Sequence, residues 1–243
     1  MVTLLIFILV LGILVLVHEF GHFIVAKKSG LTVEEFGFGF PPRIFSRKIK
    51  GTLYSINLLP LGGFVKILGE DGSETDNPNS FASKSISVKS LITVAGVAMN
   101  FILGALLLII GFNIGLPQML NEENEVFAKN IQIQIVAVSN NSPAEIAGLK
   151  LGDSVINFSA QGGSASGGKE IIDFQNFINS NKGKEITLEV KRGKDFFEST
   201  VTPRVNPPPE EGAIGVALAK TGVVSYPWYQ SIWLGLKSSV IML

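Results

Sequence analysis

The chain has 243 residues, of which 47% are hydrophobic and only 16% charged, and its mean hydropathy is +0.40. Soluble domains carry about 25% charged residues, so this composition excludes a disordered chain and argues against an ordinary soluble globule. Twenty basic and twenty acidic residues cancel, and we expect no nucleic-acid partner without a basic excess. The absence of cysteine excludes a disulfide scaffold, a thiolate metal site and a cysteine nucleophile.

Three apolar stretches predict a multi-pass α-helical membrane protein. Residues 1–26 and 90–116 are each long enough to cross a hydrocarbon layer of about 30 Å. The first lacks the basic start and small-residue cleavage site of a signal peptide. The second is too long for a buried core helix. A third stretch, 226–243, opens with interface-type aromatic residues and is still apolar at its last residue. We therefore expect the start of a third transmembrane helix in a truncated sequence.

The distribution of lysine and arginine predicts the orientation. Residues 27–89 contain nine basic and six acidic residues, whereas residues 122–211 contain nine basic and thirteen acidic residues. Because basic loops stay on the cytoplasmic side, we expect 27–89 to be cytoplasmic and the larger polar segment to be extracytoplasmic. The expected location is the inner (plasma) membrane.

Residues 51–70 are unusually apolar for a loop between membrane helices. They predict two short β-strands on either side of a Leu-Pro-Leu-Gly-Gly break. Backbone at membrane depth must be paired or shielded by protein, and a β-hairpin that dips toward the membrane meets that condition. A small hairpin that lies on the membrane surface is the alternative.

Residues 125–219 predict a compact α+β domain inserted between the second and third spans. Strands are expected at 131–138, 153–159, 185–191 and 196–202, and a helix at 171–178. Ser142-Pro143-Ala144-Glu145 has the pattern of a capped helix start. Residues 161–168 predict a flexible loop, and residues 206–211 a stiff connector.

The motif His18-Glu19-Phe20-Gly21-His22 carries the candidate chemistry. On a helix, residues four apart share one face, so His18 and His22 can present two ring nitrogens to one Zn²⁺. Glu19 lies one step round the helix, where its carboxylate can accept a proton from a zinc-activated water. The spacing is that of a metalloprotease, which predicts His18 and His22 as metal ligands and Glu19 as the catalytic residue.

The position of this motif strengthens its interpretation. His18 and His22 are the only histidines of the chain, and they lie in a membrane-spanning run, where ionisable residues are costly and usually functional. The alternative is a set of polar side chains that reach the interface from the end of a helix.

With this motif in an apolar helix, the chain resembles the site-2 protease family of intramembrane zinc metalloproteases. The closest resemblance is to the bacterial regulator-of-sigma-E type, which has an extracytoplasmic PDZ domain. The matching segments run in order: VHEFGHFIVAKKSG (17–30), FGFGF (36–40), LPLGGFVKILGED (59–71), AGVAMNF (95–101) and SPAEIAGLKLGD (142–153). The resemblance implies cleavage of a single-pass, anti-sigma-factor-like substrate within the membrane, in regulated proteolysis.

The resemblance also implies substrate-binding residues. The family hairpin adds an edge strand to the unwound substrate, which points to Gly62, Gly63, Phe64 and Val65. Asn100 matches a family asparagine that helps to hold substrate or hairpin near zinc; an interhelical hydrogen bond is its alternative role. In the PDZ segment, the backbone of Ile214, Gly215 and Val216 could receive a peptide. The other possibility is that this domain only filters substrates by size.

Two departures from the family pattern stand out. Val97 replaces a proline, which alters local helix geometry but removes no chemistry. The third zinc ligand of the family, an aspartate in a Leu-Asp-Gly motif, does not occur in this sequence, and we expect it beyond Leu243. Two hypotheses from different classes follow: an intramembrane zinc endopeptidase, or an inactive membrane-anchored PDZ binding module. A soluble-type protease tethered by one helix fits less well, because its motif would lie outside the membrane.

Overall fold

The computed structural model describes residues 1–160, 170–209 and 211–242. The chain divides into two compact units. Unit 1 comprises Met1–Ile109 with Trp233–Leu243, and unit 2 comprises Ile110–Ile232.

Two long helices dominate the apolar part of the chain, as the sequence predicts. Helix α1 spans Val2–Lys28 and helix α2 spans Ile86–Ile114. Both are long and apolar enough to cross a membrane. Helix α1 ends with Lys27 and Lys28 in its last turn, where positive charge favours the negative end of the helix dipole.

The segment between these helices forms one sheet from two long, bent strands, β1 (Val33–Ile49) and β2 (Thr52–Ile67). Residues 35–38 of β1 pair with 63–66 of β2 on one side and with 53–56 on the other. The second half of β1, residues 43–49, pairs with 52–57. The sheet therefore has four segments in the order 61–67, 33–38, 52–57 and 43–49.

This pairing corrects the predicted hairpin at 51–70. Its two halves are strands, but they do not pair with each other, because residues 33–38 lie between them. Gly37 makes this close packing possible, since a Cβ there would overlap the ring of Phe64 and lie 2.8 Å from Ser55 Oγ. Thr52 Oγ1 donates to the carbonyl of Val33 (2.9 Å).

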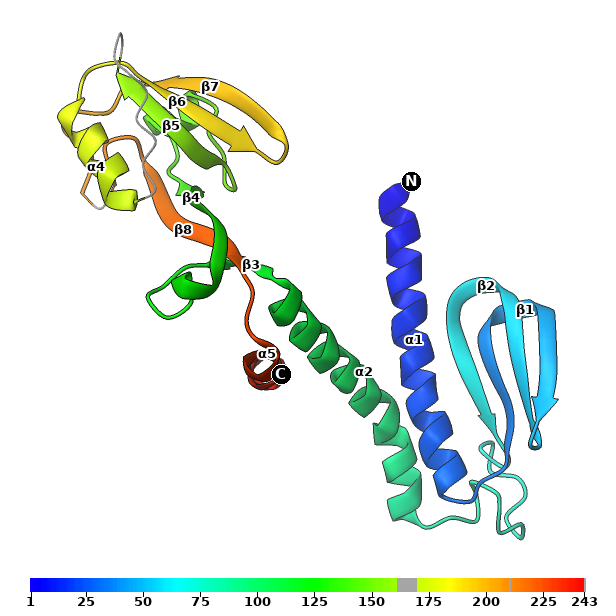
Figure 1. The fold of residues 1–243 in the computed structure, drawn as a ribbon. Helices are drawn as coiled ribbons and strands as arrows, with labels where there is room; N and C mark the ends of the chain where they lie inside the picture. The colour runs from blue at the N-terminus through cyan, green and yellow to red at the C-terminus, as the bar shows by residue number, and fades with distance from the viewer. Residues whose placement is uncertain (161–169, 210, 243) are drawn as a thin grey trace. The chain divides into compact units, whose positions relative to one another are not determined.

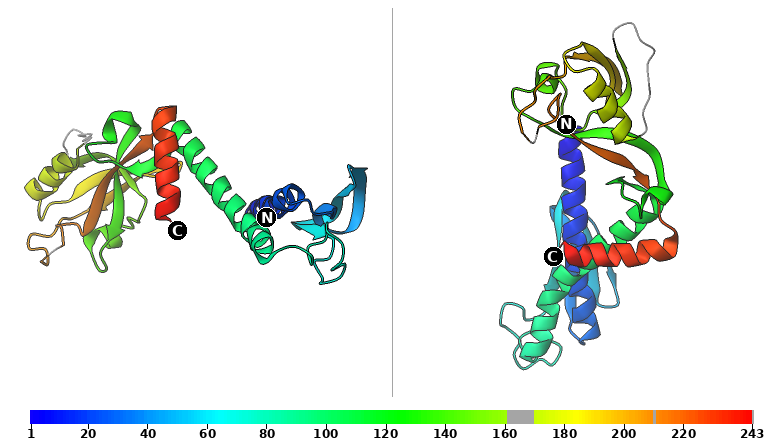
Figure 2. Two further views of the ribbon diagram at one scale, coloured as in Figure 1. Left: turned by 90° about the horizontal axis from the view of Figure 1, so that it is seen from below. Right: turned by 90° about the vertical axis from the view of Figure 1, so that its left-hand side faces the viewer.

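The sheet lies beside α1 within unit 1, as all three views show (Figures 1 and 2). Phe23 of α1 packs against Phe36 and Tyr54 of the sheet, at ring-centroid distances of 5.0 and 6.0 Å. Nearer the start of α1, a Cβ on Gly12 would lie 3.1 Å from the carbonyl oxygen of Pro60. The Leu-Pro-Leu-Gly-Gly break thus reaches the middle of the apolar helix.

Unit 2 contains a six-stranded sheet in the order β3-β8-β4-β5-β6-β7. Its strands are β3 (Leu116–Met119), β4 (Ala128–Val138), β5 (Ser154–Ala160), β6 (Ile186–Arg192), β7 (Asp195–Val201) and β8 (Val216–Val224). Its short helices are η1 (Glu125–Phe127), α3 (Pro143–Ile146) and α4 (Ile171–Ser180). The predicted strands and helices of this segment are confirmed as β4 to β7, α3 and α4; β3, η1 and β8 were not predicted.

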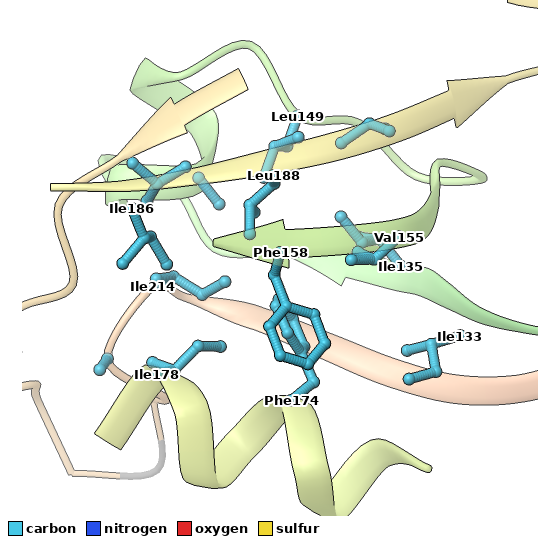
Figure 3. Close-up of a cluster of buried hydrophobic side chains, with 14 residues drawn as sticks. Ile133, Ile135, Leu149, Val155, Phe158, Phe174, Ile178, Ile186, Leu188 and Ile214 are labelled. Atoms are coloured by element: carbon cyan, nitrogen blue, oxygen red, sulfur yellow. The ribbon is translucent and has the colours of Figure 1, made fainter. Parts of the chain in front are cut away.

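One hydrophobic core holds unit 2 together (Figure 3). Phe174 and Ile178 of α4 pack onto the sheet, and Phe158 lies 5.2 Å from Phe174 between ring centroids. The predicted cap at α3 is confirmed, because Ser142 Oγ accepts from the Glu145 amide (3.2 Å). The predicted loop at 161–168 lies outside the described residues, as does Glu210 of the predicted connector.

The predicted third span contains helix α5 (Trp228–Ile241). Its helical state is confirmed. Only α1 and α2, among the described residues, are long and apolar enough to qualify as candidate membrane spans, so a crossing by α5 stays a prediction.

Candidate metal centre

The two histidines of α1 converge on one point of α2. Their ring centroids lie 4.8 Å apart, with the ring planes at 76°. A Cβ atom on Gly96 would lie 2.7 Å from Nε2 of His18 and 2.5 Å from Nε2 of His22. Both Nε2 atoms therefore face the same stretch of α2 backbone, as the four-residue spacing predicts.

A hydrogen bond sets the tautomer of His22. Its Nδ1 lies 2.6 Å from the carbonyl oxygen of Ile92 on α2. A carbonyl oxygen can only accept, so Nδ1 carries a hydrogen, and in the neutral ring Nε2 then has the lone pair that a metal requires. The same bond fixes the orientation of the ring.

Small residues bring the two helices close enough for these contacts. A Cβ on Gly21 would overlap the carbonyl oxygen of Ala95 and lie 2.8 Å from Met99 Cγ. Gly21 lies inside the motif and is fully packed. Its missing side chain is thus what lets α2 approach the histidine face of α1.

Glu19 lies beside the edge of the sheet. A Cβ on Gly63 would lie 3.7 Å from Cγ of Glu19 and 3.8 Å from Cα of Leu16. The next residue back, Gly62, has a φ of +157° and lies beside Val15. The segment 61–67 therefore passes beside Glu19 of α1, with two glycines where it meets the helix.

The remaining predicted substrate residues of unit 1 have different surroundings. The ring of Phe64 lies over Gly37, and Val65 packs against the buried cluster of unit 1. Asn100 lies one helical turn after Gly96 on α2, and its buried Oδ1 has no hydrogen-bond partner among the described residues. An orphaned buried acceptor of this kind normally finds a partner.

The donor set suits zinc. Two imidazoles with converging Nε2 atoms and a neighbouring carboxylate are the ligand types that Zn²⁺ takes in peptidases. No group of three His, Cys, Asp or Glu side chains converges among the described residues, so His18 and His22 are the two residues here that could hold the metal.

Two residues of this centre were not predicted. Gly96 provides the space that the histidines occupy, and Ile92 provides the carbonyl that orients His22. The only sequence signal for Gly96 is a glycine inside an apolar helix, which lowers helix stability and therefore often has a packing reason. A backbone carbonyl gives no signal at all.

The predicted peptide-binding residues Ile214, Gly215 and Val216 belong to unit 2. Ile214 and Val216 line a cavity of about 220 Å³ formed by α4 and the start of β8. Gly215 has a φ of +75°, and its amide donates to the carbonyl of Gly212 (3.0 Å). That amide is therefore already used within the turn.

A pair of histidines and a glutamate in HExxH spacing, on an apolar helix packed against a second apolar helix, defines a metallopeptidase-type centre. Residues 6–240 match the family described as Peptidase family M50. The chain belongs to this family, whose proteases are membrane proteins.

Curated relatives agree with this assignment. A protein from Clostridium perfringens named "Putative zinc metalloprotease" is 38% identical over 196 residues, which cover 79% of this chain and 52% of the relative. A protein of the same name from Clostridium acetobutylicum is 35% identical over 216 residues, covering 86% of this chain and 56% of the relative. The chain thus spans about half the length of these relatives. Their names agree with the zinc predicted from the motif.

A solved structure resembles part of the chain. The PDZ domain of an SdrC-like protein from Listeria monocytogenes aligns with 36% of this chain and 86% of that structure, at 19% identity and a TM-score of 0.31. This likeness is too weak to define the fold of unit 2, so the PDZ assignment stays a prediction.

Proposed function

We propose that this chain forms the zinc-binding part of an intramembrane metalloendopeptidase that cleaves single-pass transmembrane proteins in regulated proteolysis, with anti-sigma-factor-like proteins as substrates. One observation supports this proposal above the others. Glu19 of the histidine motif lies beside Gly63, at the edge of a sheet that follows an apolar helix to its middle. The carboxylate that would transfer the proton, Glu19, thus lies next to a sheet edge that could bind an extended peptide.

The residues divide the chemistry between them. His18 and His22 hold zinc through Nε2, and the Ile92 carbonyl keeps His22 in the required tautomer. Zinc, when bound, supplies Lewis-acid activation of water and of the scissile carbonyl. Glu19 takes the proton of the attacking water and delivers it to the leaving amine.

The sheet provides a way to hold the substrate extended. Segment 61–67 pairs with 33–38 on one side, and its other edge has no strand partner among the described residues. A substrate helix hides its carbonyls in its own hydrogen bonds, whereas a strand added to this edge exposes them. Gly62 and Gly63 permit close approach, and the orphaned Oδ1 of Asn100 is available to accept a substrate N–H.

The bilayer completes the setting. With α1 and α2 across the membrane, the basic excess of 27–89 favours the cytoplasmic side of the bilayer for the basic end of the sheet and for the C-terminal end of α1, which carries the motif. The PDZ segment is then extracytoplasmic.

The test is Glu19→Gln in a longer protein that contains this chain. We expect cleavage of a transmembrane substrate to fall by about 10²–10⁴-fold, with zinc content unchanged, because the histidines supply the coordination. Glu74→Gln, in the polar loop after β2, is the matched control and should cleave normally. His18→Ala and His22→Ala should lose zinc in elemental analysis. Near-normal cleavage by Glu19→Gln would refute the assignment.

A second candidate function is a membrane-anchored PDZ binding module without peptidase activity. The cavity of about 220 Å³ beside α4 supports it. So does β8, whose residues 216–219 pair with β4 on one side only, among the described residues. If this function holds, a peptide with a free carboxylate should bind the full chain, and Leu218→Lys should abolish binding. Lack of binding by the unaltered chain would favour a size filter.

A further inference from the structure

The four-segment sheet of unit 1 has two edges, and the proposed function uses only one. The outer edge is the second half of β1, residues 43–49, which pairs with 52–57. Its sequence, RIFSRKI, mixes large apolar and basic side chains on an exposed strand. Ile44 and Phe45 are 63% and 59% exposed. Such exposure needs a partner.

The apolar and basic side chains occupy different levels along the sheet. Across the sheet, Phe45 pairs with Ile56, Ile56 with Phe38, and Phe38 with Gly63. These four residues form one row, or level, of the sheet. Gly63 is the residue beside Glu19, so this level lies inside the apolar part of α1. Most exposed large apolar side chains of the sheet lie at this level and beyond it, toward the Pro41-Pro42 bend: Phe40, Ile44, Phe45, Ile56, Leu58, Leu59 and Leu61. Ile49, between Lys48 and Lys50, is the exception.

The basic level lies nearer the C-terminal end of α1. Arg47 is opposite Tyr54, and the ring of Tyr54 packs edge-on against Phe23, five residues before Lys28. Lys48 and Lys50 follow farther along the same edge. Along the axis of α1, the exposed side chains of the sheet therefore change from apolar to basic at about the same position as the side chains of α1 itself.

The ion pairs follow the same division. Arg43 is the one basic residue of this strand on the apolar side of the change, and its Nη2 lies 2.8 Å from Glu35 Oε1. Lys66, on the opposite edge, pairs with Glu34 (2.7 Å). Arg47, Lys48 and Lys50 have no acidic partner within the described part of the chain. The edge therefore carries three charges without an ion-pair partner at one end and exposed apolar side chains at the other.

We propose that the outer edge of the sheet is a lipid-binding surface. Ile44 and Phe45 lie among acyl chains, and Arg47, Lys48 and Lys50 bind the headgroups of anionic phospholipids. Two observations favour a bilayer over a protein partner. The basic side chains complement anionic headgroups, and the sheet and α1 change from apolar to basic at the same position along the helix axis. The surface leaves only the 61–67 edge open to peptide. This inference rests on the membrane position of unit 1, and not on peptidase activity.

The test uses the full chain in lipid nanodiscs, with one cysteine introduced at Ile44 or at Ile49 and labelled with a fluorophore. Quenching is compared between spin-labelled phosphatidylglycerol and spin-labelled phosphatidylcholine. At Ile44 we expect strong quenching by both lipids, because the label contacts acyl chains. At Ile49 we expect several-fold stronger quenching by phosphatidylglycerol. The combined variant Arg47→Gln, Lys48→Gln, Lys50→Gln should abolish that preference and keep its zinc.

A matched triple variant in unit 2, Lys182→Gln, Lys184→Gln, Lys194→Gln, should keep the lipid preference. Three results would overturn the proposal. The first is a label at Ile44 that neither lipid quenches, and the second is a preference at Ile49 that survives the loss of the three charges. Inorganic phosphate is the third arm. If it abolishes the preference at constant ionic strength, the cluster is a general anion site and not a lipid surface. Zinc binding and the effect of Glu19→Gln are independent of all these outcomes.

Discussion

Nε2 of His22 lies 2.5 Å from the point that a Cβ atom on Gly96 would occupy. The atom expected to bind zinc therefore occupies the space that the side chain of any other residue type at position 96 would fill. Nε2 of His18 lies almost equally close, at 2.7 Å. The ligand face of α1 thus depends on one missing side chain of its neighbour.

Gly96→Ala should reduce zinc binding by at least about tenfold. The new methyl group would displace one or both imidazoles, and groups that orient metal ligands typically affect affinity by about 10–100-fold. Zinc content of the purified protein, together with titration by a competing chelator, measures the effect.

Gly104→Ala provides the control on the same helix. A Cβ there meets no atom within 4 Å, so the variant should bind zinc normally and gain slightly in helix propensity. Equal zinc affinity of the two variants would show that α2 does not constrain the histidines.

A proline at Val65 should slow substrate cleavage without loss of zinc. Val65 lies on the 61–67 edge opposite Phe36, and proline removes a backbone donor from the strand. The loss should be greatest for substrates with stable helices, which most need the added strand. Cleavage rates of a stable and a glycine-loosened substrate measure this difference.

Phe45→Pro is the matched variant on the opposite edge. It removes a donor from a strand that the proposed substrate does not touch, so its cleavage rate should stay close to that of the unaltered protein. An unchanged rate with Val65→Pro, for both substrates, would exclude strand addition at this edge.

Single-cysteine labelling should place residues 27–89 and unit 2 on opposite sides of the membrane. The chain has no cysteine of its own, so Asn181→Cys and Glu74→Cys each give one site. A membrane-impermeant reagent added to intact cells should label Asn181→Cys, and label Glu74→Cys only after permeabilisation. The reverse pattern would invert the proposed topology.

Asp153 should make unit 2 sensitive to acid. Its carboxylate is fully buried and accepts from Arg192 Nε and Nη2 (2.7 Å each) and from the Lys150 amide (2.8 Å). Burial opposes ionisation, but these hydrogen bonds outweigh it and hold the pKa of Asp153 below its usual value. The stability it contributes is therefore complete above the unfolded-state pKa of about 3.9 and is lost as the pH falls through the folded-state value.

Asp153→Asn should lower the unfolding free energy of unit 2 by about 1.5–3 kcal/mol at neutral pH, as expected for hydrogen bonds to a charged group. The difference from the unaltered chain should disappear in acid. Scanning calorimetry of the full chain at several pH values tests both points. The exposed Asp195→Asn is the control, and an equal loss there would remove the special role of the Asp153–Arg192 pair.

The sequence predicted the parts of the centre that depend on local geometry. The four-residue spacing of His18 and His22 determines their common face on any helix. Likewise, the alternation and capping pattern of unit 2 follow local rules, and Ser142 caps α3 as expected. Gly96 and Ile92 could not be predicted, because their roles arise only where α2 meets α1.

The sheet of unit 1 shows why pairing was harder to predict than strand content. Residues 33–38 contain Gly37 between two phenylalanines, and glycine normally weakens a strand. Here the glycine is required, because the ring of Phe64 occupies the space of its side chain. A residue that reads as a breaker in the sequence is therefore at the centre of the sheet.

The central position of residues 35–38 has a consequence for how the sheet moves. These residues pair on both sides, so their amides should exchange with solvent more slowly than those of 61–67, which pair on one side. The segment 61–67 can then detach and return while the other three segments stay paired. Such local opening would let a substrate strand enter or leave beside Glu19 without unfolding the sheet that holds it.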